Sequence, residues 1–482
     1  MSAIKFTTIL LSLIILLSSC SHTTTARETI LDHKTHIEDK IVYDLPQVSR
    51  LCDELDITKG YADVGDCKLY YEIDGSGTPI VFINGGPGGT HYDFHFGESL
   101  PKDNFKVIYY DQRGCGLSEH KAVEGYSFEQ TIDDLEKLRQ ALKIDKWIVA
   151  GHSYGGGIAQ YYSIKYPGHV LGQVLIGTVP MMNLDEFRGG RTQNFYSEAE
   201  MAKMTELRTL FQKGQLTRSQ YTYNMMLNGS WKRSSFVKPG KDQMVRMVTH
   251  GISSDPNYSS DFTAYNFEHV FETCPVPTLI VEGKHDLIWK ADRPAIFKKY
   301  HPNAQIVVLE SSGHNMFADE PVKFNRAIVE WTNTLSNPSE PDLLAWQQRS
   351  NDLIGNQLIL IESNKSFASL IRTSGIDAGL KYYEEIKNEQ PDKPIFFENT
   401  INMLGYEYLF AEKHTEAIEI FKLNVQEFPE SWNVYDSLGE AYLKSGQTVL
   451  GYENYKRSVE LNPDNENGQA ILDKLNSYAK AK

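Results

Sequence analysis

Residues 147–157 read WIVAGHSYGGG, and this stretch decides the fold. Trp147–Ala150 is a short apolar run typical of a buried strand, and Gly156–Tyr166 has the character of a helix. Between them lies a Gly-x-Ser-x-Gly motif centred on Ser153. A sharp turn between a strand and a helix lifts a serine hydroxyl clear of the backbone. We therefore predict that Ser153 is a catalytic nucleophile.

Similar apolar runs recur before and after this stretch. They are Ile80–Ile83, Val107–Tyr110, Val174–Ile176, Thr278–Val281 and Ile306–Leu309. Each is nearly continuous in apolar residues, as expected of strands buried on both faces of a parallel sheet. Amphipathic stretches such as Ser127–Leu142 separate them. The alternation predicts an α/β domain with a mostly parallel sheet flanked by helices, over residues 58–335.

A serine nucleophile needs a base, and the base needs an orienting acid. When the serine lies on a strand–turn–helix of this kind, the acid and then the histidine follow it in the chain. Asp286 and His314 each follow a predicted strand, at the sheet edge where ligands bind. We predict these two as acid and base. Three rivals stay open: Asp292 for the acid, and His285 or His301 for the base.

An oxyanion hole is also expected, since acyl transfer places negative charge on the former carbonyl oxygen. The glycine-rich loop Asn84–Gly89 follows the first apolar run, and its glycines let backbone N–H groups approach a ligand. We predict the N–H groups of Gly86 and Tyr154 as the two donors. A plain glycine–proline turn is the alternative. His152, beside the nucleophile, is expected to pack locally and not to act as a second base.

These motifs together resemble the proline iminopeptidases (prolyl aminopeptidases) of the α/β-hydrolase fold. The resemblance rests on Asn84–Gly89, Asp111–Ser118, Gly151–Gly156, Asp286 and His314. It covers roughly residues 58–335 without much of the middle. It implies a peptidase that releases an N-terminal residue, often proline, from short peptides through an acyl-enzyme, with no cofactor.

The chain departs from this family at two places. Asn84 stands where the family usually has histidine, which alters the hydrogen bonding of the loop. Residues 179–271 are inserted between strands and predict a helical cap, in which the family's glutamates hold the α-ammonium of the substrate. The acidic motif does not align here, and the segment around Trp231 is basic. The candidates are Glu198, Glu200, Glu206 and Glu268, although each is also typical of a solvated helix face.

The first nineteen residues have the character of a secretory signal. They carry one charge, Lys5, and the apolar stretch Ile9–Leu17, which is too short to span a membrane. The sequence Leu-Ser-Ser-Cys that ends at Cys20 resembles the lipobox of bacterial lipoproteins. It implies cleavage before Cys20 and lipidation of its thiol, whereas an ordinary signal peptide is the alternative. We expect a protein anchored by lipid in the bacterial cell envelope, periplasmic or surface-exposed, with residues 20–57 as tether and extension.

Composition serves mainly to exclude classes of protein. The 482 residues contain 48 Lys and Arg against 63 Asp and Glu, a formal net charge of −15, which argues against a general nucleic-acid binder. Five cysteines are too few for a disulfide-rich scaffold. Pairing among Cys52, Cys67, Cys115 and Cys274 stays open, with Cys52 and Cys67 close enough in sequence to pair. The sequence contains no Cys-x-x-Cys or His-Glu-x-x-His motif, so we predict no metal.

The C-terminal part has a different pattern. Asn337–Pro341 is polar and contains two prolines, which predicts a linker over residues 336–345. Residues 346–482 carry only helical patterns. A period of 34 appears there, since Leu404-Gly405 recurs as Leu438-Gly439, and Tyr408 recurs as Tyr442. This matches the tetratricopeptide pattern, with repeats at about 398–431 and 432–465. Such repeats bind a protein partner or pack on a neighbouring domain, and the sequence favours neither.

The leading hypothesis is therefore a serine hydrolase, most similar to an aminopeptidase that acts on short peptides. A carboxylic-ester or amide hydrolase with the same three catalytic residues is the first alternative. The second alternative is a lipid-tethered repeat protein that binds a partner and whose hydrolase domain is vestigial.

Overall fold

A computed structural model describes residues 40–97, 99–120, 127–181, 196–251, 265–288, 292–389, 391 and 395–480. The predicted signal peptide and Cys20 lie outside the described residues, as do parts of the cap, at 182–195 and 252–264. None of the helices in the described part of the chain combines the length and the apolar character that crossing a membrane requires.

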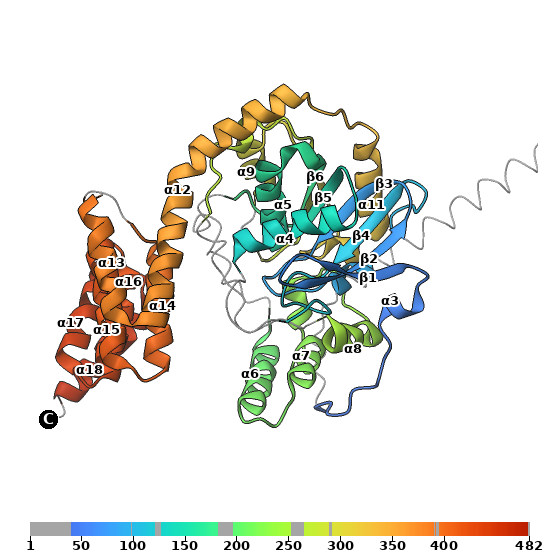
Figure 1. The fold of residues 1–482 in the computed structure, drawn as a ribbon. Helices are drawn as coiled ribbons and strands as arrows, with labels where there is room; N and C mark the ends of the chain where they lie inside the picture. Colours follow the sequence, from blue (N-terminus) through green and yellow to red (C-terminus); the bar gives the residue numbers. More distant parts are fainter. Residues whose placement is uncertain are drawn as a thin grey trace, which may run out of the picture.

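The described residues form one eight-stranded sheet in the order β1-β2-β4-β3-β5-β6-β7-β8 (Figure 1). The strands are β1 (Thr58–Asp63), β2 (Lys68–Gly75), β3 (Thr78–Ile83), β4 (Phe105–Tyr110), β5 (Trp147–His152), β6 (Val170–Ile176), β7 (Thr278–Gly283) and β8 (Gln305–Leu309). Strand β2 pairs antiparallel with β1 and β4, and all other pairs are parallel. The six apolar runs are β3 to β8, which confirms the predicted α/β fold.

Helices cover both faces of the sheet. Helices α4 (Phe128–Ala141), α5 (Tyr154–Lys165) and α9 (Arg293–Tyr300) contribute to one apolar core. The 3₁₀ helix η1 (His91–Phe96) and helices α10 (Met316–Asp319) and α11 (Pro321–Thr332) contribute to the core on the opposite face. Short 3₁₀ turns, η2 (Pro167–His169) and η6 (Phe271–Thr273), lie in the connections.

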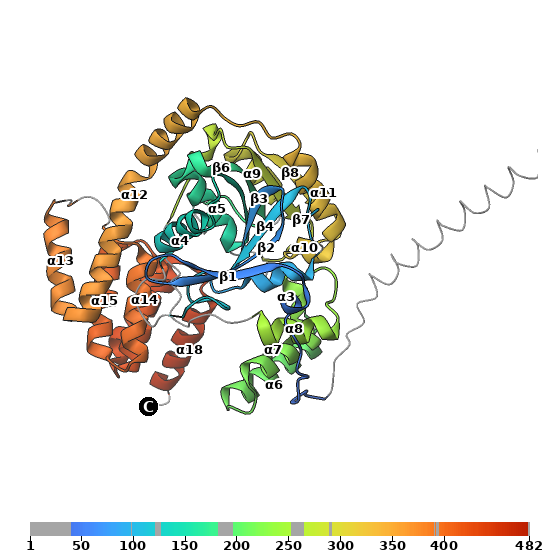
Figure 2. The ribbon, with the colours of Figure 1, turned by 45° about the vertical axis from the view of Figure 1, so that its right-hand side comes forward.

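The cap lies between β6 and β7. It contains α6 (Glu198–Gln212), α7 (Arg218–Leu227), η4 (Ser230–Arg233) and α8 (Lys241–His250), and Figure 2 shows its three α-helices together on one side of the sheet. The N-terminal extension packs on this cap, because the Asn224 side chain bonds both the N–H and the carbonyl of Val42. The extension then continues into α3 (Leu51–Glu54).

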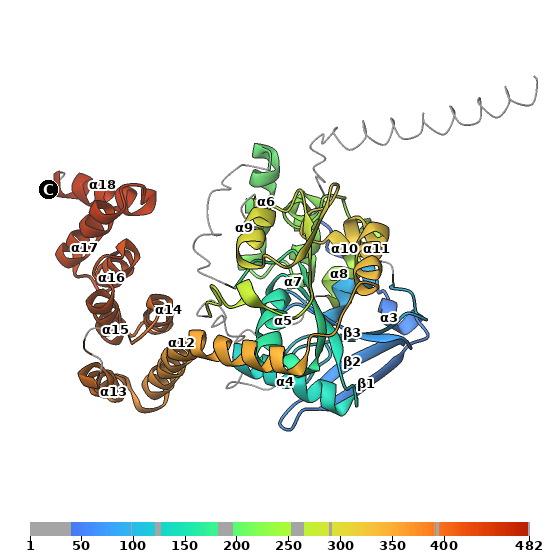
Figure 3. The same cartoon turned by 90° about the horizontal axis from the view of Figure 1, so that it is seen from above.

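Helix α12 (Glu340–Ser374) begins inside the predicted linker and joins the two parts of the chain (Figure 3). Near its start, Trp346 belongs to the core of the α/β domain, and near its end Phe367 belongs to the core of the C-terminal helices. These helices are α13 (Ile376–Glu389), α14 (Glu398–Phe410), α15 (His414–Glu427), α16 (Trp432–Lys444), α17 (Thr448–Leu461) and α18 (Glu466–Lys480). The pair α14–α15 recurs as α16–α17 with a spacing of 34 residues.

Candidate active site

Ser153 occupies a strained turn between β5 and α5. Its φ of 53° and ψ of −118° lie outside the regions that side-chain-bearing residues favour, which costs about 1–3 kcal/mol. Its N–H donates to the carbonyl of Ile176 at 2.9 Å, and the Thr178 hydroxyl donates to the Ser153 carbonyl at 2.7 Å. Hydrogen bonds from the end of β6 and just beyond it therefore hold the strained turn in place.

Two glycines of the motif permit this turn through close backbone contact. A Cβ added at Gly151 would lie 2.1 Å from the carbonyl oxygen of Gly155. A Cβ added at Gly155 would lie 2.2 Å from the carbonyl oxygen of Ile83, at the end of β3. Because neither contact tolerates a side chain, the spacing of glycines around the serine is a steric requirement of the turn.

The predicted acid and base are in contact. His314 follows β8, and its Nδ1 lies 2.7 Å from Oδ2 of Asp286, which follows β7. The Ile288 N–H donates to the other oxygen of Asp286 at 2.8 Å. Burial disfavours the carboxylate, but His314 and then Arg293 outweigh it and hold the pKa of Asp286 well below its usual range. Asp286 therefore stays ionised and can hold Nδ1–H of the imidazole.

Arg293 supports this acid and was not predicted. Its Nη1 donates to Asp286 Oδ2 at 2.6 Å, and its Nη2 lies 2.7 Å from an oxygen of Glu282 in β7. All three side chains are buried. Burial, opposed by Arg293, raises the pKa of Glu282 to about 8. The only sequence signal of this group is a lone arginine at the start of the helix that follows Asp286.

His152 fixes the backbone next to the base. Its Nε2 lies 3.0 Å from the carbonyl oxygen of His314, and the two rings lie 4.7 Å apart. Burial, together with the charge of His314, lowers the pKa of His152 to about 3, so the ring is neutral and Nε2–H donates. Since the residue after His152 is Ser153, this bond also ties the nucleophile turn to the histidine loop.

The glycine-rich loop lies directly against the nucleophile. A Cβ at Gly85 would lie 3.1 Å from the Cβ of Ser153. Gly86 has a φ of 134°, and a Cβ there would lie 2.5 Å from the N atom of Gly88, so the loop requires glycine. Asn84 donates its side-chain amide to the Gly89 carbonyl and thereby closes the loop. The loop therefore borders the nucleophile turn, and the roles of the Gly86 and Tyr154 N–H groups as oxyanion donors stay predictions.

Comparison with known proteins identifies the family of the chain. Residues 78–321, half of the chain, match the family model described as the alpha/beta hydrolase fold. The chain belongs to this family. Among its relatives, the proline iminopeptidase of Clostridioides difficile strain 630 is 27% identical over 298 residues, 58% of this chain and 98% of that protein.

Two other relatives have similar coverage. The proline iminopeptidase of Saccharolobus solfataricus is 26% identical over 306 residues, 58% of this chain and 93% of that protein. The AB hydrolase superfamily protein YisY of Bacillus subtilis is 26% identical over 280 residues, 55% of this chain and 96% of that protein. Among solved structures, VinJ superposes with a TM-score of 0.47 at 21% identity, over 58% of this chain and 99% of that one.

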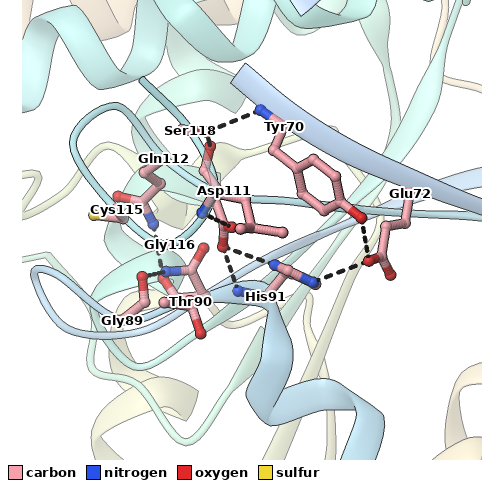
Figure 4. A network of polar contacts seen from close by, with 12 residues as sticks. Tyr70, Glu72, Gly89, Thr90, His91, Asp111, Gln112, Cys115, Gly116 and Ser118 are labelled. Atoms are coloured by element: carbon pink, nitrogen blue, oxygen red, sulfur yellow. Dashed lines mark hydrogen bonds and ion pairs between the residues drawn. The ribbon is translucent and has the colours of Figure 1, made fainter. Parts of the chain in front are cut away.

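In this alpha/beta hydrolase, the segment after β4 bonds the glycine-rich loop at its start and just beyond its end. Figure 4 shows the second of these contacts, between Asp111 and His91. The Gln112 side chain donates to the carbonyl of Asn84, at the start of the loop, at 3.0 Å. Asp111 accepts the backbone N–H of His91 at 2.8 Å and contacts its Nδ1 at the same distance, just beyond the loop. The second oxygen of Asp111 accepts the N–H of Leu117 at 2.7 Å. The Asp-Gln-Arg-Gly motif therefore positions this loop.

The cap is attached to the loop that carries the base. Asp319 accepts N–H groups from Phe236, Val237 and Gly313 at 2.8 to 3.0 Å. The N–H of Asn315 donates to the carbonyl of Ser234 at 2.9 Å. Ser234, Phe236 and Val237 all belong to the cap segment after η4. Movement of the cap is therefore coupled to the position of His314. Sequence reasoning missed Asp319, which is simply one acid of a short helix.

The four cap glutamates have contacts or exposure of their own. Glu198 is exposed, and Glu206 is exposed and pairs with Lys203. Glu200 is buried, caps the start of α6 and bonds Lys232 at 2.7 Å. The carboxylate of Glu268 contacts the Tyr300 hydroxyl at 3.4 Å and His269 at 3.8 Å. Recognition of a substrate amine by these four residues stays a prediction.

The rival catalytic residues lie in other environments. Asp292 precedes α9 with a φ of 75°. The ring of His285 stacks on Phe236 at 4.4 Å, and the buried ring of His301 stacks on Phe271 at 4.4 Å. The hydrogen bond between His314 and Asp286 favours the predicted pair over these rivals. In the described part of the chain, the four cysteines are all buried and form no disulfide.

Proposed function

We propose that the chain is a serine aminopeptidase that releases N-terminal proline or another small residue from short peptides. The observation that carries the hydrolytic part is the 2.7 Å contact between His314 Nδ1 and Asp286, at the sheet edge that holds the strained Ser153 turn. The aminopeptidase part is supported by similarity to proline iminopeptidases along 93–98% of the length of two of them.

The reaction begins when the Ser153 oxygen attacks the carbonyl carbon of the first residue. His314 takes the hydroxyl proton on Nε2, and Asp286 stabilises the resulting imidazolium through Nδ1–H. The carbonyl oxygen becomes an oxyanion, which accepts hydrogen bonds from the N–H groups of Gly86 and Tyr154. Such donors typically contribute about 3–4 kcal/mol to the stability of the transition state.

The intermediate then collapses. The C–N bond breaks, the imidazolium gives its proton to the leaving nitrogen, and the shortened peptide departs. Water attacks the acyl-enzyme while His314 accepts one of its protons, and return of that proton to Ser153 releases the amino acid. In the net reaction, one water molecule is consumed and one peptide bond is cleaved. No other reactant is needed.

Asp93 is our candidate for holding the α-ammonium of the substrate. It lies in η1, just beyond the glycine-rich loop, and its side chain makes no hydrogen bond or ion pair with the part of the chain that the structure describes. A Cβ at Gly251, at the end of α8 in the cap, would lie 3.4 Å from its Oδ1. Burial raises the pKa of Asp93 to about 7. A bound ammonium would stabilise the ionised carboxylate.

A carboxylic-ester or amide hydrolase is the second candidate function. The observation that favours it is that Glu200, the buried acid among the four cap candidates, already bonds Lys232 and caps the start of α6. A cap without an acid for the substrate would accept uncharged acyl groups. In that case Ser153 and His314 would perform the same steps on an ester.

Two assays test these proposals. A fluorophosphonate probe should label the wild type and leave Ser153→Ala unlabelled; failure to label the wild type would favour a vestigial hydrolase domain. Proline and alanine arylamides should then be compared with short-chain aryl esters. Cleavage of the esters alone would contradict the aminopeptidase and support the second candidate.

We also propose a lipid anchor at Cys20 and a tetratricopeptide character for the C-terminal helices. The second proposal is supported by the 34-residue recurrence of α14–α15 as α16–α17. These repeats would take short peptides or a protein partner near the envelope membrane. Incorporation of a radioactive fatty acid should be lost in Cys20→Ala, and persistence of the label would contradict the anchor.

A further inference from the structure

Three metal-ligating side chains from separate segments meet behind the glycine-rich loop. They are Cys52 of α3, Glu72 of β2 and His91 of η1, and their ligand atoms all lie within 4.8 Å of one another. All three residues are buried, with exposures of 0%, 0% and 2%. This cluster is not recognisable in the sequence, because its members lie 20 and 19 positions apart and form no metal-binding motif.

The imidazole of His91 is oriented as a metal ligand would be. Its Nδ1 contacts Asp111 at 2.8 Å, which leaves Nε2 directed at Glu72 Oε1 at 3.2 Å (Figure 4). Nε2 is buried, and no hydrogen bond to it is found among the described residues. Histidine ligands of metals almost always use the other ring nitrogen to bond a carboxylate or a carbonyl, as His91 does with Asp111.

The carboxylate of Glu72 is held in the same manner. The Tyr70 hydroxyl donates to Oε1 at 2.8 Å, and His95 Nε2 contacts Oε2 at 2.8 Å. Outer hydrogen bonds of this kind fix the direction of ligating carboxylates. Two of the three side chains therefore have positioning partners of their own.

We propose that Cys52, Glu72 and His91 bind a Zn²⁺ ion. Sulfur, nitrogen and oxygen donors suit zinc, whereas Ca²⁺ and Mg²⁺ take oxygen donors. Zinc bonds of about 2.0–2.3 Å in a tetrahedron place neighbouring donor atoms about 3.3–3.8 Å apart. Since the three donor atoms here lie within 4.8 Å of one another, binding requires the side chains to approach by about 1 Å. One thiolate and one carboxylate neutralise the ion.

Binding displaces protons from the ligands. The Cys52 thiol loses its proton when its sulfur bonds the metal, and His91 binds through a deprotonated Nε2 while Nδ1–H stays on Asp111. The fourth position is filled by water or by His95, which lies one helical turn after His91. The ion would join α3, and with it the N-terminal extension on the cap, to the helix that follows the glycine-rich loop.

An alternative is that the cluster is only a hydrogen-bond network, with a proton shared among His91, Glu72 and Asp111. In such a network the buried Cys52 thiol is one more hydrogen-bonding group beside His91 and Glu72. This alternative predicts that neither the absorption spectrum nor the thermal stability of the protein responds to metal. The two interpretations are therefore distinguishable with metal alone.

The test uses the full-length chain, purified without a histidine tag, stripped with a chelator and titrated with Co²⁺. We expect one equivalent of Co²⁺ to give a thiolate-to-cobalt charge-transfer band and the visible bands of tetrahedral coordination, both abolished by Zn²⁺. Cys52→Ser should lose the charge-transfer band. Cys274→Ser is the matched control, a buried thiol outside the cluster, and should keep it.

A second variant guards against failure of Cys52→Ser to fold. Glu72→Gln keeps the shape of the side chain and should bind Co²⁺ at least tenfold more weakly, so the same concentration of Zn²⁺ should raise the Tm of the wild type more than that of this variant. A wild type without a thiolate-to-cobalt band, or a band that persists in Cys52→Ser, would overturn the zinc site. Neither result depends on hydrolase activity.

Discussion

Nη1 of Arg293 lies 2.6 Å from Oδ2 of Asp286, the same oxygen that contacts Nδ1 of His314 at 2.7 Å. One oxygen of Asp286 thus contacts both the guanidinium of Arg293 and the imidazole of the predicted base, His314. Arg293 also lies 2.7 Å from an oxygen of Glu282, so its guanidinium contacts two buried acids. The orientation of the base therefore depends on a residue that does not touch the substrate.

Arg293→Met should lower kcat/KM about 10- to 100-fold, because small displacements of a catalytic group cost up to about 100-fold in rate. Loss of the cation should raise the pKa of Asp286 and shift the acid limb of the kcat/KM profile toward higher pH. Removing one partner of a buried ion pair also destabilises the fold by about 3–5 kcal/mol. The double variant with Glu282→Gln should recover stability and keep the shifted profile; an unshifted profile would contradict the positioning role.

His301 should make the fold sensitive to acid. Burial lowers its pKa in the folded state to about 3, whereas an unfolded histidine titrates near 6.5. Between these values only the unfolded chain binds the proton, so stability is lost as the pH falls from about 6.5 toward 3. Between pH 8 and pH 5, the free energy of unfolding should fall by about 2 kcal/mol less in His301→Phe than in the wild type. Urea unfolding at both pH values measures this difference, and the exposed His269→Phe should match the wild type.

Gly85→Ala should impair acylation with little effect on stability. The new Cβ would lie 3.1 Å from the Cβ of Ser153 and from Nδ1 of His152, so the nucleophile must shift by a few tenths of an ångström. Small displacements of reacting groups cost up to about 100-fold in rate. The rate of fluorophosphonate labelling measures the effect. Gly168→Ala, with open space around the added Cβ, is the control, and equal labelling of the two variants would contradict the contact.

Asp93→Asn should separate the two candidate functions. If Asp93 holds the α-ammonium, KM for proline arylamide should rise at least tenfold, whereas hydrolysis of uncharged aryl esters should be unchanged. Asp242→Asn, at an exposed acid of the cap helix α8, serves as the control and should leave both activities at the wild-type level. Equal effects of Asp93→Asn on amide and ester would show that this residue acts on the fold and not on the amine.

The parts of the fold that were predictable are those dictated by local chemistry. The runs that became β3 to β7 are apolar because these strands are largely buried on both faces, and Gly151 and Gly155 are required by backbone contacts. The edge strand β8 is also apolar in sequence, although only Leu309 is fully buried in it. Strands β1 and β2 were not predicted. They pair antiparallel at the edge of the sheet, and β2 has alternating burial without a continuous apolar run.

What the sequence could not reveal depends on contacts between distant residues. Asp319 bonds residues 82 and 83 positions away, and Arg293 is recognisable only once Glu282 and Asp286 are seen beside it. Glu200 was proposed for a substrate amine, yet its carboxylate bonds Lys232, 32 residues on. In sequence, each of these charges is indistinguishable from one on a solvated helix face.

Pro341 was part of the evidence for a linker, but it lies in the first turn of helix α12. Proline is tolerated in the first turn of a helix, where its missing N–H has no intrahelical acceptor. It lies there in α12, and Ser339 caps the helix by accepting the N–H of Asp342. The segment predicted to separate the two parts of the chain therefore begins the helix that joins them.

Trp346→Ala tests whether α12 is part of the hydrolase core. The Trp346 indole is 1% exposed, donates Nε1–H to the Val270 carbonyl at 2.9 Å and packs on Phe271. Its removal should cost about 3–5 kcal/mol and lower the temperature at which hydrolase activity is lost in a brief heat challenge. Leu344→Ala, on the same helix but 56% exposed, should leave that temperature nearly unchanged. If both variants inactivate at the wild-type temperature, α12 is a connector that the hydrolase domain does not need, and the two cores are energetically independent.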